Sequence, residues 1–111
     1  MKTIKGQFRQ GDVLVEFVDG LTVPSTAKAV PLENGATILA HGEATGHAHK
    51  YIGGATLFRD DGASSGGYVV VDDPVSIVHD EHYPTPPHVG VAIVIRQREY
   101  VAGDISRNVE D

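Results

Sequence analysis

All six histidines of this sequence, the side chains best suited to metal or proton chemistry, fall into two short clusters. The first cluster reads HGEATGHAHKYIGG and the second reads VHDEHYPTPPH. Together they contain His41, His47, His49, His79, His82 and His88. Because imidazole nitrogens bind Zn, Cu, Fe and Ni well, two clusters of this kind predict a site for a divalent transition metal.

The first cluster carries an H-x-H pattern in which His47 and His49 flank a single alanine. On a β-strand, residues two apart point to the same face and lie about 6.5–7 Å apart along the chain. On a helix they would point to different sides. The residues around this pair favour a strand, so both side chains can converge on one ion.

The second cluster can complete such a site. If residues 75–80 form a strand, His79 and Glu81 continue one of its faces, and His82 follows where the chain turns into prolines. A pair from each cluster gives a ligand set for Zn, Fe, Ni or Cu. The predicted metal ligands are therefore His47, His49, His79 and His82.

Other roles for these residues stay open. Glu43 and Asp80 can orient metal-bound histidines from outside the ligand set. Without a metal, the clusters can form a pH-sensitive patch, because histidine titrates near neutrality. His41 is expected at the end of a strand, and His88, which follows Pro87, is expected in a stiff, exposed loop.

Composition excludes several classes of protein. The 111 residues contain no cysteine, so disulfides, thiolate metal sites and thiol nucleophiles are absent. The net charge of -6, without a basic stripe, predicts no binding to nucleic acid or to membrane surfaces. No secretory signal is seen, so a cytoplasmic location is expected. No phosphate-binding, dinucleotide-binding or G-x-S-x-G motif appears; catalytic residues, and whether the protein is an enzyme, stay unassigned.

Thirteen glycines and six prolines divide the chain into short β-branched runs. This predicts one all-β domain over residues 1–111, an antiparallel sandwich or small barrel. A short strand is expected between the prolines of 21–35, and a loop over 60–67. One helical turn is expected in the tail, capped by Asp104. The main strands are expected at 12–18, 36–41, 47–52, 55–60, 68–73, 75–80 and, centrally in the sheet, 89–100.

Two resemblances follow from these motifs. GEATGHAH resembles the opening of the first cupin motif, although one residue is missing before His47 and glycines replace the expected glutamate. The segments GDVLV, GEATGHAHK, HDEHYPTPPHVG and RQREY, in this order, resemble a family of short uncharacterised proteins of bacteria and their phages. That resemblance implies that the four predicted ligands form one unit with Gln97 and Tyr100, and it brings no established activity.

Two functional hypotheses follow. The first is a small metal-binding β protein whose histidine-rich site holds a divalent transition metal. The second is a structural or assembly protein, such as a phage particle accessory or an oligomeric scaffold, which would be virion-associated if phage-encoded. A homo-oligomer is expected in either case, with a trimer favoured because histidines can meet on its axis.

Overall fold

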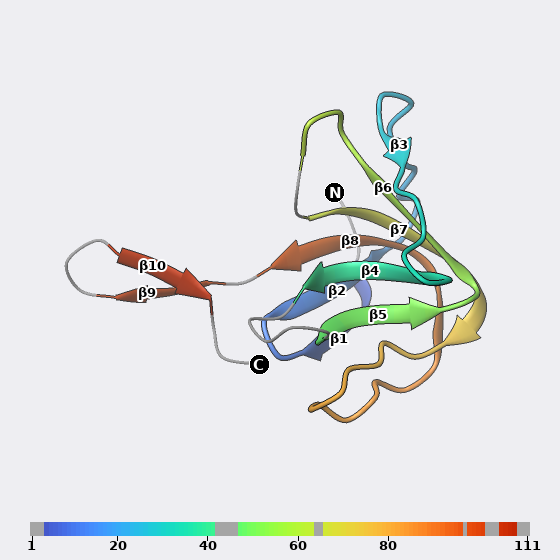
Figure 1. The fold of residues 1–111 in the computed structure, drawn as a ribbon. Coiled ribbons are helices and arrows are strands. Elements are labelled where there is room, and N and C mark those ends of the chain that lie inside the picture. Colours follow the sequence, from blue (N-terminus) through green and yellow to red (C-terminus); the bar gives the residue numbers. More distant parts are fainter. Residues whose placement is uncertain (1–3, 42–46, 64–65, 97, 102–104, 109–111) are drawn as a thin grey trace.

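The computed structural model describes residues 4–41, 47–63, 66–96, 98–101 and 105–108, and these form strands but no helix (Figure 1). The all-β prediction is therefore confirmed. No helix in this part of the chain is long and apolar enough to cross a membrane. The strands are β1 (Ile4–Gln10), β2 (Val13–Val18), β3 (Lys28–Ala29), β4 (Ala36–His41), β5 (Ala48–Ile52), β6 (Ala55–Arg59), β7 (Gly67–Val75), β8 (His88–Arg96), β9 (Arg98–Val101) and β10 (Ile105–Asn108).

Six strands form one antiparallel sheet in the order β1-β2-β8-β7-β6-β3. Its centre is β8, which pairs Val94 with Val15 of β2 and Ala92 with Val69 of β7. The expectation that this apolar run lies centrally is confirmed, but the expected length of 89–100 is wrong, because β8 ends at Arg96 and residues 98–101 form β9 in a separate sheet. The alternation of β2 explains its place, because Val13, Val15 and Phe17 all point into the core.

The hairpin of β4 and β5 forms a second layer over the six-stranded sheet (Figure 1). Leu39 and Ala40 of β4 and Tyr51 of β5 belong to the same buried cluster as the inward side chains of the large sheet. Apolar faces of two sheets packed against each other make a sandwich-like fold. The remaining buried members of this cluster are Val13, Val15, Phe17, Leu57, Val69, Val71, Ile77, Ala92 and Val94.

Several boundaries agree with the sequence-based expectation. Strand β4 has the predicted limits 36–41, and the short β3 lies between the prolines of 21–35 as expected. Residues 60–67 contain the connection between β6 and β7.

Other expectations are wrong. The segment 75–80 is not a strand, because β7 ends at Val75 and only a single bridge follows, between Val78 and Lys50. The tail contains strand β10 where a helical turn was expected. Its proposed cap, Asp104, lies outside the described residues, as do Glu43 and Gln97.

Candidate metal centre

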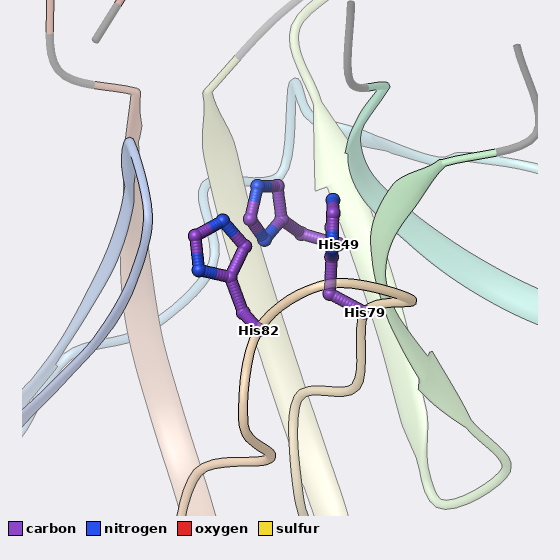
Figure 2. Close-up of side chains that lie close together, drawn as sticks. All are labelled: His49, His79 and His82. Carbon is purple, nitrogen blue, oxygen red and sulfur yellow. The ribbon is translucent and has the colours of Figure 1, made fainter. Parts of the chain in front are cut away.

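Three histidine side chains meet at one end of the sandwich (Figure 2). His49 comes from β5, whereas His79 and His82 come from the loop over 76–87 that joins β7 to β8. One nitrogen of each ring lies within 4.8 Å of a nitrogen of the other two. The ring centroids of His49 and His79 are 4.4 Å apart, and those of His79 and His82 are 4.8 Å apart. The ring of His82 is 5.6 Å from that of His49.

Hydrogen bonds join the two ends of the loop over 76–87. The N–H of Ile77 donates to Thr85 Oγ1 at 2.9 Å, and the N–H of Thr85 donates back to Ile77 O at 3.1 Å. Between them, Val78 exchanges two backbone hydrogen bonds with Lys50 of β5, at 2.9 and 3.1 Å. Lys50 is the residue after His49, so this bridge places His79 beside the ring of His49.

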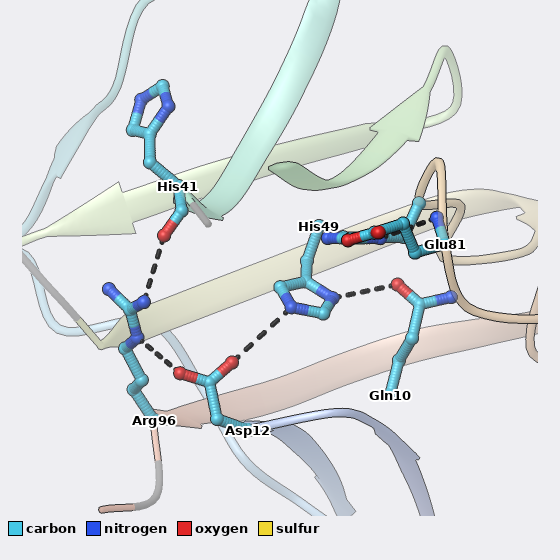
Figure 3. A network of polar contacts seen from close by, with 7 residues as sticks. Gln10, Asp12, His41, His49, Glu81 and Arg96 are labelled. Carbon is cyan, nitrogen blue, oxygen red and sulfur yellow. Dashed lines mark hydrogen bonds and ion pairs between the residues drawn. The ribbon is translucent and has the colours of Figure 1, made fainter. Parts of the chain in front are cut away.

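Gln10, the last residue of β1, joins the loop to β5. Its buried amide nitrogen donates to Ile77 O at 3.0 Å and to Tyr83 O at 2.9 Å. Because both partners are carbonyl oxygens, the amide oxygen must point the other way, where it lies 2.8 Å from His49 Nδ1. His49 Nδ1 therefore carries a hydrogen and donates it to Gln10 (Figure 3).

A buried carboxylate faces the other nitrogen of the same ring. The side chain of Asp12 is fully buried, accepts from Arg96 Nε at 2.7 Å, and places Oδ1 3.3 Å from His49 Nε2 (Figure 3). In the neutral ring with Nδ1 protonated, Nε2 carries a lone pair. Two electron-rich atoms at this separation are favourable only with a cation between them, either a proton on Nε2 or a metal ion.

His47 lies next to the three histidines, one residue before β5 begins. Its ring centroid is 5.8 Å from that of His79. Its Nδ1 lies 3.0 Å from Glu81 Oε1 and its Nε2 lies 3.8 Å from Asp80 Oδ2. Three of the four predicted ligands are thus brought together, while the fourth faces the two carboxylates between His79 and His82.

The other two histidines lie elsewhere. His41 ends β4 as expected, with its exposed ring 3.3 Å from Glu33.

The expectation of an exposed His88 is wrong. His88 begins β8, is only 7% exposed, and stacks on Phe8 with centroids 4.2 Å apart. Its Nδ1 donates to Pro86 O at 2.8 Å, so its Nε2 accepts the hydroxyl hydrogen of Tyr51 at 2.6 Å. Burial lowers the pKa of His88 and raises that of Tyr51.

Sequence reasoning missed the residues that hold His49. Gln10 and Asp12 flank Gly11 at the turn between β1 and β2, and in the sequence they are far from either histidine cluster. Arg96 of β8 forms an ion pair with Asp12, and this pair fixes the carboxylate that faces His49. A polar residue on each side of a turn glycine is common on protein surfaces, and only tertiary pairing shows that both side chains are buried.

Comparison with known protein families gives one result. A family profile described as a domain of unknown function, DUF8820, matches residues 9–97. No curated protein and no solved structure matches the chain significantly.

Proposed function

The chain belongs to the DUF8820 family, and from the geometry of its histidine site we propose that it binds one divalent transition-metal ion. The proposed ligands are His49, His79 and His82. The observation that carries the proposal is the convergence of three ring nitrogens within 4.8 Å of one another. Nitrogen ligands of this kind suit Zn, Fe, Ni or Cu.

The spacing fits an ion after a small contraction. An ion at the centre of a nitrogen triangle with 4.8 Å sides lies about 2.8 Å from each corner, whereas Zn–N bonds are about 2.0–2.1 Å. Each ring then has to move inward by about 0.7 Å at most. Two of the three rings sit on one loop, so a small shift of the segment over 79–82 supplies most of this movement.

The donor set supports the same reading. Gln10 fixes the hydrogen of His49 on Nδ1, which leaves Nε2 as the metal-binding nitrogen and matches the outer hydrogen bond that metal-bound histidines make. Asp12 Oδ1, buried at 3.3 Å from that nitrogen, adds negative charge beside the proposed ion. The 3.3 Å between Asp12 Oδ1 and His49 Nε2 equals the separation, about 3.3 Å, of two ligands of a tetrahedral ion with bonds of about 2.0–2.1 Å.

His79 needs one rearrangement. Its Nδ1 accepts a hydrogen bond from the N–H of Glu81 at 3.0 Å, so the neutral ring carries its hydrogen on Nε2. Binding an ion at Nε2 moves that hydrogen to Nδ1 and releases the bond from Glu81. The loss is about 0.5–1.5 kcal/mol for one hydrogen bond. It is small beside the roughly 10–16 kcal/mol of a structural zinc site.

His47 is proposed to hold the ligand loop from outside. Its contacts with Asp80 and Glu81 tie the start of β5 to the two residues between His79 and His82. A ligand role for His47, as the sequence predicted, stays open to the same experiment.

Metal content and titration test the proposal. Protein purified without chelator should contain about one transition-metal ion per site, and the metal-free protein should bind Zn²⁺ or Ni²⁺ with measurable heat. His82→Ala should abolish binding, whereas His41→Ala, at an exposed histidine, should leave it unchanged. His47→Ala should weaken binding if His47 holds the loop, and abolish it if His47 is a ligand. A metal-free preparation that takes up neither ion would refute the proposal.

An assembly role is the second candidate. In the described part of the chain, β9 and β10 pair only with each other and extend away from the body (Figure 1). A two-stranded hairpin alone is marginally stable in water. We therefore propose that the hairpin contacts a second copy of the chain in a homo-oligomer, for which a trimer is our first expectation. Light scattering at tens of micromolar, on the order of transient interface affinities, tests this, and a monomer would contradict it.

A further inference from the structure

Asp12 places a buried carboxylate oxygen beside the proposed metal ligands. The residue is 1% exposed, and its Oδ2 accepts from Arg96 Nε at 2.7 Å. Its Oδ1 lies 3.3 Å from His49 Nε2, yet among the described residues this oxygen accepts no hydrogen bond. In the same part of the chain, the buried Nε2 of His82 has no hydrogen-bond partner either. An unsatisfied buried polar atom costs about 1–3 kcal/mol, so two such atoms beside His49 indicate a shared ligand.

The geometry of the contact between Asp12 and His49 distinguishes a metal ion from a proton. Hydrogen bonds between an N–H and a carboxylate, when one or both are charged, measure about 2.7–2.9 Å and are close to straight. Two ligands of a tetrahedral ion lie about 3.3 Å apart and point at the ion, not at each other. The contact of 3.3 Å has the second length and lacks the alignment of a hydrogen bond.

Arg96 supplies the outer contact that a metal-bound carboxylate needs. Carboxylates that bind a metal are themselves hydrogen-bonded by groups outside the ligand set. Arg96 takes this role at Asp12 Oδ2, as Gln10 does at His49 Nδ1, so each of the two side chains keeps one atom for the ion (Figure 3). Arg96 also donates to His41 O at 2.8 Å, which fixes the guanidinium and with it the orientation of the carboxylate.

We infer that Asp12 Oδ1 is the fourth ligand of the ion and closes the site. This inference rests on the proposed function, because it requires that the three histidines bind a metal. Sites with four protein ligands are structural, whereas catalytic zinc keeps one position for water or substrate. Tetrahedral geometry suits Zn²⁺, while Cu²⁺ and Ni²⁺ prefer square-planar or tetragonal sites. The ion then joins the β1–β2 turn of the large sheet to β5 of the second layer and to the loop over 76–87.

Cobalt substitution, with azide as a probe for an open position, tests the inference. Wild type loaded with Co²⁺ should show the intense visible bands of a four-coordinate ion, and azide should not change them. In Asp12→Asn the amide oxygen must face Arg96, so the NH₂ group faces the ion and cannot bind it. Water then takes the fourth position, and the spectrum should respond to azide.

The affinity for Co²⁺ gives a second measurement. Asp12→Asn should bind Co²⁺ at least about tenfold more weakly, the smallest loss typical when even an outer partner of a metal ligand is removed. Asp61→Asn removes the same charge from an exposed turn and should match wild type in affinity and in its insensitivity to azide.

Three results would overturn the inference while leaving the histidine site in place. They are a wild-type spectrum that azide changes, an Asp12→Asn spectrum that azide leaves unchanged, and equal affinity of Asp12→Asn and wild type for Co²⁺. Failure of wild type to bind either Co²⁺ or Zn²⁺ would instead refute the proposed function. If Asp12→Asn does not fold, the azide titration of wild type decides: a response counts against the closed site, and an unchanged spectrum supports it.

Discussion

Replacing Gln10 should loosen the histidine site without touching a histidine. Gln10 is 3% exposed and connects three segments: its own strand, the loop through Ile77 and Tyr83, and His49. Gln10→Met keeps the length and approximate volume of the side chain but removes all three hydrogen bonds. The loop then loses its attachment to β1, and His49 loses the acceptor that fixes its tautomer.

The expected loss of stability follows from these contacts. Two of the three bonds are buried, and an unsatisfied buried partner costs about 1–3 kcal/mol. The bond to Tyr83 O is only partly buried, so water can replace it and its loss costs about 0.5–1.5 kcal/mol. The unfolding free energy should therefore fall by roughly 2.5–7.5 kcal/mol, a large part of the about 5–15 kcal/mol typical of a domain.

Urea denaturation of the metal-free protein measures this loss, and ¹⁵N NMR of the histidine rings reports the tautomer. Wild type should show a hydrogen on His49 Nδ1, and Gln10→Met should lose that preference. Gln7→Ala, at an exposed glutamine of the same strand, should change stability by no more than about 0.5 kcal/mol. A Gln10→Met protein within about 1 kcal/mol of wild type, with the His49 signal unchanged, would refute the reasoning.

Two further predictions concern pH and backbone geometry. Burial lowers the pKa of His88 in the folded protein. As pH falls through about 6.5, His88 is therefore protonated in the unfolded chain before it is protonated in the folded protein. With chelator present, the unfolding free energy should therefore be highest above that pH and fall on acidification. Urea denaturation at several pH values should show a smaller fall for His88→Gln than for wild type, and a fall equal to wild type for His41→Gln. The same dependence of unfolding free energy on pH in all three proteins would contradict this. Gly67 has φ +108°, and a Cβ there would overlap the carbonyl oxygen of Phe58. At Gly62 φ is also positive, but among the described residues no atom lies within 4 Å of an added Cβ. Gly67→Ala should therefore lower stability by about 1–3 kcal/mol more than Gly62→Ala. Equal losses in thermal melts would refute the role of that contact.

The sequence predicted what depends on local pattern. The alternation of Val13, Val15 and Phe17 gave the inward face of β2, and an apolar run on both faces gave the central place of β8. Glycines and prolines marked the turns, because few other residues tolerate those backbone conformations. These features need no knowledge of which strands become neighbours.

The strand expected over 75–80 failed for a physical reason. Val75, Ile77 and His79 alternate as a strand would, but the chain pairs only at Val78 before the loop closes through Thr85. Alternation reports which side chains are buried, and Ile77 is indeed fully buried. It does not report whether a partner strand is available, so a loop that inserts one apolar side chain gives the same pattern.

The roles of Gln10 and Asp12 could not be predicted for a related reason. Both precede β2, and a polar residue beside a turn glycine is usually solvated. Pairing of β2 with β8 brings Asp12 next to Arg96, and packing of β5 brings His49 against Asp12. Each of these contacts joins segments far apart in the chain.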